Sequence, residues 1–330
     1  MDKLVKGLVS IVTPCYNGEK LIYRLLDSVL RQDYPNVEMF VVDDGSTDAT
    51  KNVIEKYIEQ FRIKGYALTY LYQDNAGQAA AINKALPLVR GEYMIWPDAD
   101  DFYSSEQALS IFVRTFETLD DSYAILRCWE SLVSEKDMSL ITINKFNIHK
   151  EHIFEEYFTG KESIAVAGTH MVRMKHFDVV NPQRHIFDTL RPQNFQMLLP
   201  LCYSFNIFTI PQDLYTILVR QDSHSRSSKT YEQQCEAFDS YHEILMKTLA
   251  SMAKMSDDDK EHFTRLSYIH CLTDKLVFAL RAGKSCESKA MALELSSMGV
   301  KQTAVGKIRL FLVSIPPLLK LFEKVVNKLR

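Results

Sequence analysis

Residues 93–103 read Tyr-Met-Ile-Trp-Pro-Asp-Ala-Asp-Asp-Phe-Tyr, an apolar run that leads directly into three carboxylates. The apolar part predicts a buried strand. Residues i and i+2 of an extended segment point the same way, so Asp98 and Asp100 should present their carboxylates together. Two such charges about 4 Å apart repel by about 4 kcal/mol at an effective dielectric constant near 20. Either open water around an acidic turn or a bound cation relieves this repulsion, and oxygen-only ligands favour Mg²⁺, Mn²⁺ or Ca²⁺ over Zn²⁺.

Strands and helices alternate upstream of this segment. Apolar runs predict strands at residues 8–13, 39–42, 70–73 and 92–96, and helical periodicity predicts helices at residues 20–31, around 54–61, and at 79–89. Such alternation implies a mostly parallel sheet flanked by helices, with ligands bound beyond the carboxyl ends of the strands. The polar clusters of the sequence all follow predicted strands, so the fold class is expected to be α/β with its site at that edge.

The pattern changes in the second half of the chain. Residues 104–107 resemble a capping box before a helix, and further strands are predicted at residues 123–133, 141–146, 164–168 and 214–220. From about residue 231 the apolar residues follow helical spacing. We therefore expect two regions, an α/β domain at residues 1–225 and a helical C-terminal region at residues 226–330.

Composition is typical of a soluble globular protein, with 330 residues, 46% hydrophobic and 25% charged. The six cysteines form no C-x-x-C pair, so neither a disulfide frame nor a zinc site is predicted. The N-terminus lacks the pattern of a secretion signal. We expect a cytoplasmic protein.

The formal net charge of −3 is unevenly distributed. Residues 301–330 carry seven basic side chains and one acidic side chain, a net of +6, which leaves −9 for the rest of the chain. An acidic body argues against nucleic-acid binding. The apolar stretch at residues 310–322 is too short to span a bilayer, so the tail is expected either to lie on an anionic membrane surface or to pack on the domain.

Four motifs in register carry a family resemblance. They are Ser-Ile-Val-Thr-Pro-Cys-Tyr-Asn-Gly at residues 10–18, Val-Val-Asp-Asp-Gly-Ser-Thr-Asp at 41–48, Asp-Asn-Ala-Gly-Gln at 74–78 and Pro-Asp-Ala-Asp-Asp at 97–101. In order and spacing they resemble the family 2 glycosyltransferases, over roughly residues 8–225. The resemblance implies a type A glycosyltransferase fold (GT-A, Rossmann-like), a UDP-sugar donor, Mn²⁺ or Mg²⁺ as the cofactor, and inversion at the anomeric carbon.

The resemblance also implies roles for individual residues in donor binding. Tyr16 is expected to stack on the nucleobase and Asp44 to accept a hydrogen bond from the uracil ring. The other residues expected to bind the donor are Thr13, Asp43, Asn75, Gly77 and Gln78. An ordinary core ring at Tyr16, a helix-start pair at Asp43 and Asp44, and a simple turn at residues 75–78 are the structural alternatives.

The same resemblance assigns the metal site and its surroundings. Asp98 is expected to hold the ribose or a water on the metal, and Asp100 to bind the metal directly. His224 is a candidate third ligand or phosphate contact, with a surface histidine as its alternative. Asp101 is a candidate catalytic residue, either contacting the sugar or supporting a ligand. The metal is expected to bridge the two phosphates and neutralise the charge on departing UDP.

The general base departs from the family pattern. Where relatives carry an acidic pair at a helix start, this chain has Gln193 and Asn194, which cannot act as bases and are expected to orient the acceptor. Asp188 is the nearest carboxylate and the predicted catalytic base, with His185 as the alternative. A lone aspartate in this position is also typical of a turn or helix cap.

Other classes of protein fit the sequence less well. A haloacid-dehalogenase-type phosphatase carries its Asp-x-Asp after the first strand, and a Rossmann dehydrogenase needs Gly-x-Gly-x-x-Gly there, which residues 13–18 do not provide. The absence of a Gln-x-x-Arg-Trp motif disfavours a processive synthase. We expect transfer of one sugar to a glycan or lipid-linked acceptor, with a non-catalytic sugar-nucleotide-binding scaffold as the alternative.

Overall fold

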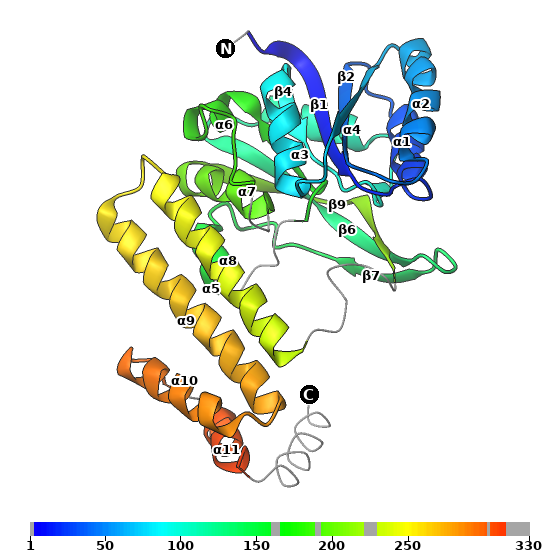
Figure 1. Ribbon diagram of the computed structural model, residues 1–330. Coiled ribbons are helices and arrows are strands. Elements are labelled where there is room, and N and C mark those ends of the chain that lie inside the picture. The colour runs from blue at the N-terminus through cyan, green and yellow to red at the C-terminus, as the bar shows by residue number, and fades with distance from the viewer. Residues whose placement is uncertain (1–2, 160–165, 189–192, 221–229, 302–303, 315–330) are drawn as a thin grey trace.

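A nine-stranded sheet forms the centre of the computed structural model, which describes residues 3–159, 166–188, 193–220, 230–301 and 304–314 (Figure 1). Within these ranges its strands are β1 (Val5–Cys15), β2 (Val37–Asp44), β3 (Ala67–Gln73), β4 (Gly91–Ile95), β5 (Phe102–Tyr103), β6 (Tyr123–Ser134), β7 (Leu140–Asn144), β8 (His170–Arg173) and β9 (Asn206–Val219). The four strands predicted from the first hundred residues are therefore confirmed as β1 to β4.

The strand order is β3-β2-β1-β4-β8-β6-β9-β5, and β7 pairs with β6. Strands β1 to β4 are parallel, whereas β8 runs antiparallel to both β4 and β6, and β9 is parallel to β6. The expected α/β class with a mostly parallel sheet is confirmed for this half of the molecule. Because the four parallel strands end at the same edge, that edge gathers the polar loops that follow them.

Helices cover both faces of the sheet, and each face has its own core. One core is built from α1 (Ile22–Leu30), α2 (Thr50–Lys64) and α4 (Ala108–Thr118). The other contains α3 (Gln78–Ala85), a short 3₁₀ turn (Leu86–Leu88), α5 (Phe154–Thr159), α6 (Met174–Val180) and α7 (Gln193–Ser204). Strand β2 is buried along its whole length, since it lies between these two layers.

Several predicted boundaries were wrong. The strand expected at residues 164–168 is β8 at His170–Arg173, and β9 begins at Asn206 rather than at 214. Gly168 lies just before β8 with φ +84°, and a Cβ there would lie 2.2 Å from the Tyr215 ring. The extended run therefore starts only after this glycine. The capping box expected at residues 104–107 does not form, because Gln107 caps α4 without a side-chain hydrogen bond.

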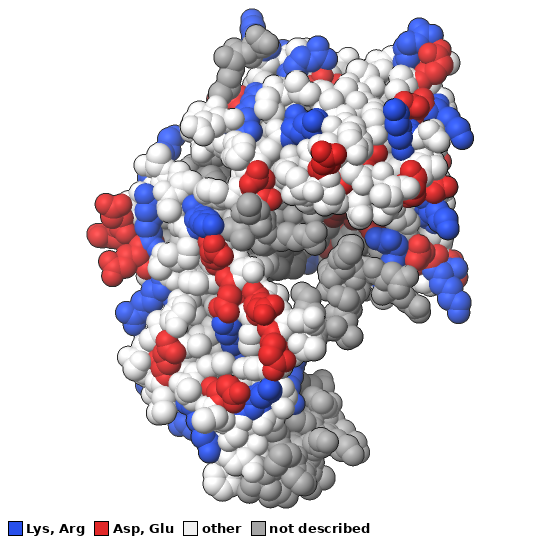
Figure 2. Space-filling view, in the orientation of Figure 1, with Lys and Arg blue, Asp and Glu red and all other residues white. Residues whose placement is uncertain are grey.

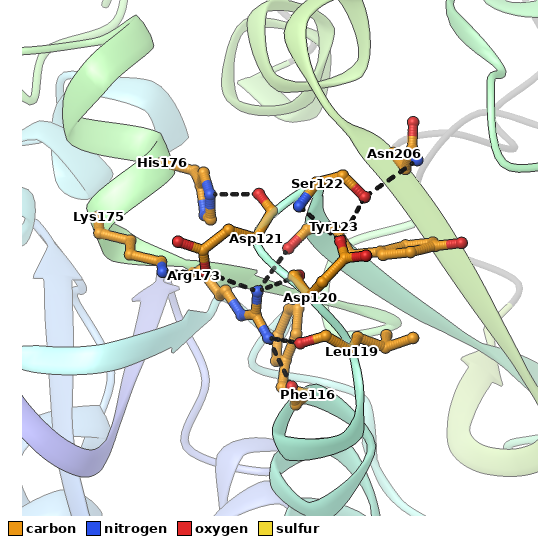
Figure 3. Close-up of polar contacts among 10 residues, drawn as sticks. All are labelled: Phe116, Leu119, Asp120, Asp121, Ser122, Tyr123, Arg173, Lys175, His176 and Asn206. Atoms are coloured by element: carbon orange, nitrogen blue, oxygen red, sulfur yellow. Dashed lines mark hydrogen bonds and ion pairs between the residues drawn. The ribbon is translucent and has the colours of Figure 1, made fainter.

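A buried guanidinium ties four elements together beside the sheet (Figure 3). Arg173, at the end of β8, donates to the carbonyls of Leu119 at 2.9 Å, Asp120 at 2.7 Å and Tyr123 at 3.1 Å, and also to Phe116. The carbonyls of Phe116, Leu119 and Asp120 lie in or just after the last turn of α4, where a cation offsets the helix dipole. His176 of α6 contacts the carbonyl of Asp121 in the same cluster. Arg173 thus joins α4, β6, β8 and α6.

The C-terminal helices are α8 (Tyr231–Ser251), α9 (Asp257–Arg281), α10 (Ser285–Ser297) and α11 (Ala304–Leu312). Figure 1 shows α8 and α9 as a long pair beside α7. Tyr241 of α8 packs on Phe195 with ring centroids 5.0 Å apart, and Phe263 of α9 packs on Phe154 at 4.8 Å. Helix α8 and the first part of α9 therefore share one hydrophobic core with the sheet, whereas the end of α9 forms a separate core with α10 and the α11 segment. The boundary near residue 225 stays a prediction.

Charges of both signs intermix over the outer face of these helices (Figure 2). Several are paired, including Lys275 with Asp239 and Lys284 with Glu232. Helix α11 packs through Leu310 and Val313 on α9 and α10, while Phe311 is 73% exposed. Residues 302–303 and 315–330 of the predicted membrane-binding tail lie outside the described residues. No helix in the described ranges is long and apolar enough to cross a bilayer.

A buried histidine makes folding stability depend on pH. Burial, together with the charge of Arg127 on the adjacent strand, lowers the pKa of His170 to about 3. An unfolded histidine titrates near 6.5, so below that pH the unfolded chain binds a proton that the native state does not. This group's contribution to stability is therefore present above pH 6.5 and is lost as the pH falls.

We predict that His170→Gln reduces the loss of stability on acidification. Between pH 6.5 and 5 the native protein should lose about 2 kcal/mol through this group, and the variant should not. Urea unfolding at the two pH values measures the difference, with the exposed His149→Gln as the matched control. Equal pH slopes for the His170 variant and the native protein would contradict the assignment.

Candidate functional site

The loop that follows β1 presents one exposed ring and one buried hydroxyl. Tyr16 is 50% exposed, so its ring face is available to a ligand. Thr13 is fully buried at the end of β1, and its Oγ1 has no hydrogen-bond partner among the described residues. Asn17 accepts a hydrogen bond from the Thr47 N–H at 2.9 Å, which joins this loop to the one after β2. The first two polar clusters predicted from the sequence thus lie together.

The two acids that end β2 are buried and serve different loops. Asp43 accepts from the Ser46 N–H and the Tyr70 hydroxyl, each at 2.8 Å. Asp44 accepts from the Gln73 amide at 2.8 Å and from the N–H groups of Ala76 and Gly77, each at 2.9 Å. Neither acid is a helix-start residue, because α2 begins only at Thr50. Asp44 instead holds the loop at residues 74–77 against the end of β2.

Close approach of that loop requires a glycine. Gly45 has φ +78°, and a Cβ on it would lie 2.6 Å from the Asn75 backbone nitrogen. A side chain at this position would therefore push the loop away. Gln78, the first residue of α3, then donates to Asp98 at 2.8 Å. This bond joins the loop after β3 to the acidic cluster after β4.

Asp98 and Asp100 form the acidic centre of the site. Burial, with a smaller contribution from the charge of Asp100, raises the pKa of Asp98 to about 7. Asp100 pairs with Arg220, whose Nη2 lies 2.7 Å from Oδ2, and both side chains are about one-quarter exposed. Burial and the nearby Asp100 carboxylate thus both disfavour the ionised form of Asp98. Among the described contacts, the Gln78 amide is the one hydrogen-bond donor to its carboxylate.

This donor set fits a hard divalent cation. Two carboxylates supply oxygen ligands, and the raised Asp98 pKa shows that its ionised form is poorly compensated, which a cation would correct. Within the described residues no group of three or more histidine, cysteine or acidic side chains is placed to hold a metal. A divalent ion held by the two carboxylates alone would keep free coordination positions for phosphate oxygens. His224, the candidate third ligand, lies outside the described residues.

Asp101 differs from its two neighbours. It is 4% exposed, and its carboxylate accepts from the Leu218 N–H at 2.9 Å and faces the Tyr215 hydroxyl at 3.4 Å. Burial and the charges of Asp100 and Asp98 raise its pKa. These contacts join Asp101 to β9, and its catalytic role stays a prediction.

The start of α7 lies against the end of β4. Trp96, two residues before Asp98, donates through its indole N–H to Asn194 at 2.8 Å. Gln193 is 5% exposed at the first position of the helix. Asn194 therefore lies beside the end of β4, and Gln193 directly precedes it in α7. These are the two residues expected to orient an acceptor. Arg191 of the same predicted segment lies outside the described residues.

The candidate bases occupy the turn before α7. Asp188 is exposed, and residues 189–192 beyond it lie outside the described residues. The two residues before Asp188 are held in place, since Asn83 of α3 bonds both polar backbone groups of Ile186 and Gln196 of α7 bonds both of Phe187. The His185 ring lies 3.3 Å from the Asn83 amide. Asp188 is thus presented to solvent from an anchored turn.

Sequence reasoning missed Arg220 as a partner of Asp100 and Tyr215 as a partner of Asp101. Tyr215 belongs to β9 and Arg220 is the first residue after it, and both are more than 110 residues from the acids they contact. A local signal existed for Arg220, because it ends a predicted strand. Its pairing depends on β9 lying beside β5 and β6, which the sequence alone does not specify.

Fold and site together define a glycosyltransferase with the type A fold. Two solved structures share that fold. Residues 1–349 of Staphylococcus aureus TarS, crystallised with UDP-GlcNAc, align with a TM-score of 0.59 and 18% identity over 87% of this chain and 89% of that one. The mannosyltransferase PcManGT from Pyrobaculum calidifontis, in complex with GDP-Man and Mn²⁺, aligns with a TM-score of 0.54 and 17% identity over 97% and 86%.

The chain belongs to glycosyl transferase family 2, whose model matches residues 10–180, just over half of its length. An uncharacterized glycosyltransferase of Rickettsia typhi is 34% identical over 133 residues, which cover 40% of this chain and 39% of the relative. The glycosyltransferase GlyA of Streptococcus pneumoniae is 32% identical over 114 residues, 34% of this chain and 16% of that protein. The chain therefore spans well under half the length of these relatives.

We predict that Asp44→Asn loosens the loop at residues 74–77. An asparagine has one acceptor oxygen, so its amide N–H₂ must face at least one of the N–H groups from which Asp44 now accepts a hydrogen bond. The variant should lose about 1–3 kcal/mol of stability and bind UDP more weakly. Urea unfolding and calorimetry measure both, with the neighbouring exposed Asp74→Asn as the control. A variant with native stability and native UDP affinity would refute this role.

Proposed function

We propose that the protein transfers a single sugar, a hexosyl or N-acetylhexosaminyl group, from a UDP-sugar to a glycan or lipid-linked acceptor, with inversion. The observation that carries the proposal is the Asp98 and Asp100 pair at the end of β4, joined through Gln78 to the loop that Asp44 holds. The complexes of TarS with UDP-GlcNAc and of PcManGT with GDP-Man and Mn²⁺ support a nucleotide-sugar donor and a divalent ion.

In the proposed donor site, the exposed Tyr16 ring stacks on the base, and Asp44 accepts from uracil through its remaining lone pair. Asp43, Thr13, Asn75 and Gly77 complete this part of the site. Mn²⁺ or Mg²⁺ held by Asp98 and Asp100 supplies Lewis-acid stabilisation of the departing diphosphate. Gln78 keeps the Asp98 carboxylate oriented toward the ligand.

On the acceptor side, we assign Gln193 and Asn194 to orienting the acceptor and Asp188 to removing the proton from its hydroxyl. A base has to approach from the side of the sugar opposite the diphosphate. Phe187, next to Asp188, is bonded to Gln196 of α7, and Asn194 near the start of that helix bonds Trp96. His185 is the alternative base; it is exposed as well, and its ring contacts the Asn83 amide at 3.3 Å.

We predict that Asp100→Ala and Asp188→Asn fail in different ways. Asp100→Ala should lose metal-dependent UDP binding and at least about 100-fold in turnover, since a catalytic metal contributes several kcal/mol. Asp188→Asn should keep UDP binding and lose about 10²–10⁴ in kcat. The measurement is UDP release from a panel of UDP-sugars with Mn²⁺ and glycan acceptors, alongside UDP calorimetry.

The exposed Asp258→Asn on α9 is the matched control and should behave like the native protein. Full activity of Asp188→Asn would move the base assignment to His185. Donor binding without UDP release for any acceptor would support the alternative function, a non-catalytic sugar-nucleotide-binding protein of glycan assembly.

We also propose peripheral attachment to the cytoplasmic face of the membrane through residues 301–330. The excess of basic residues in this segment and the exposure of Ile308 (44%) and Phe311 (73%) on α11 support it. Ile308→Ser with Phe311→Ser should reduce cosedimentation with anionic phosphatidylglycerol vesicles, while phosphatidylcholine vesicles should bind neither protein. Unchanged sedimentation of the double variant would refute the role of α11.

A further inference from the structure

Arg220 is held in place by the same acidic segment that it neutralises. It is the first residue after β9, and Leu218 two positions earlier donates its N–H to Asp101 at 2.9 Å. Phe102 of β5 also pairs with Thr216 of β9, so two neighbouring positions near the end of β9 are held against the acidic segment. Because the contacts of Asp101 fix the end of β9, they place the Arg220 guanidinium within 2.7 Å of Asp100.

The guanidinium has hydrogen-bonding capacity that the protein does not use. Within the described ranges, the one ion pair made by Asp98, Asp100 or Asp101 is with Arg220. Its Nη2 donates to Asp100, whereas its Nε is buried and has no hydrogen-bond partner in the structure. A buried donor without a partner is unfavourable, so an acceptor that reached Nε would stabilise this side chain.

A divalent ion and this guanidinium compete for the same carboxylate. Arg220 occupies Oδ2 of Asp100, and two cations on one carboxylate repel each other. A metal that binds Asp100 therefore has to displace Arg220 or bind against its charge. The planar guanidinium fork matches phosphate oxygens, so the donor's diphosphate is a suitable new partner for both its Nη and its Nε.

We propose that Arg220 acts as an exchangeable cation at the metal site. It neutralises Asp100 in the ligand-free protein, and it moves to the donor diphosphate when a divalent ion takes its place on Asp100. This inference rests on the proposed metal-dependent function, and it adds that the divalent ion and the diphosphate bind cooperatively. Metal alone binds weakly because it leaves the guanidinium without a partner, whereas metal with diphosphate gives both the carboxylate and the guanidinium a partner of opposite charge.

The exchange has consequences for substrate choice and for product release. A ligand without a diphosphate offers Arg220 no new partner, so it cannot assist metal binding. When UDP leaves with the metal, Arg220 returns to Asp100 and compensates the exposed carboxylate. Arg220 is therefore a positioning residue that couples the two ligands thermodynamically, and the coupling is reciprocal.

The test measures Mn²⁺ binding by calorimetry with and without UDP for the native protein, Arg220→Gln and Arg220→Lys. Arg220→Gln should bind Mn²⁺ alone roughly 10-fold more tightly than the native protein and bind UDP in the presence of Mn²⁺ more weakly, so that the coupling factor falls by at least about 10-fold. Arg220→Lys keeps the competing charge and loses the fork. It should bind Mn²⁺ alone as weakly as the native protein.

Arg62→Gln, which removes a guanidinium from an exposed pair with Glu59, is the matched control and should retain native coupling. Circular dichroism establishes that each variant is folded. Mn²⁺ binding by Arg220→Gln that is equal to or weaker than native in the absence of UDP would overturn the exchange and leave the metal site standing. No Mn²⁺ uptake by native protein even with UDP would overturn the metal site and the exchange together.

Discussion

Parallel strands end at one edge of a sheet, and in this protein that constraint brings five carboxylates together, those of Asp43, Asp44, Asp98, Asp100 and Asp101. Like charges at such spacing require compensation. Backbone N–H groups and hydroxyls provide it for Asp43, Asp44 and Asp101, and a guanidinium provides it for Asp100. Asp98 receives a single amide hydrogen bond in the described structure. The uncompensated charge is therefore concentrated after β4.

This uneven compensation separates acids that shape the site from acids that are available to a ligand. Asp44 fixes the loop after β3, and Asp101 fixes the end of β9, so each uses its carboxylate on the protein itself. Asp98 to Asp101 form a turn after β4, in which the Asp101 N–H bonds the Asp98 carbonyl at 3.3 Å, so the extended geometry expected for Asp98 and Asp100 was wrong. The motif at residues 97–101 thus contains the two acids that we propose hold a cation and a neighbouring residue that holds a distant strand.

The sequence predicted the half of the fold in which local signals suffice. Apolar runs followed by polar clusters located β1 to β4, and their parallel order followed from the helices between them. The second half was predicted less well, since β8 and β9 are defined by tertiary contacts such as Gly168 against the Tyr215 ring. For the same reason the partners of Asp100 and Asp101 were missed, as one directly follows β9 and the other lies in it. Motif spacing identifies acids but not the residues that compensate them.

The hydrophobic core continues from the α/β layers into helix α8. Asn194 and Phe195 are adjacent in α7, and the first bonds Trp96 beside the acidic centre whereas the second packs on Tyr241 of α8. A displacement of α8 would therefore move the start of α7 and, through Trp96, the backbone that carries Asp98. Since close-packed interiors transmit such shifts, helix α8 supports the start of α7 and, through it, the acidic centre after β4.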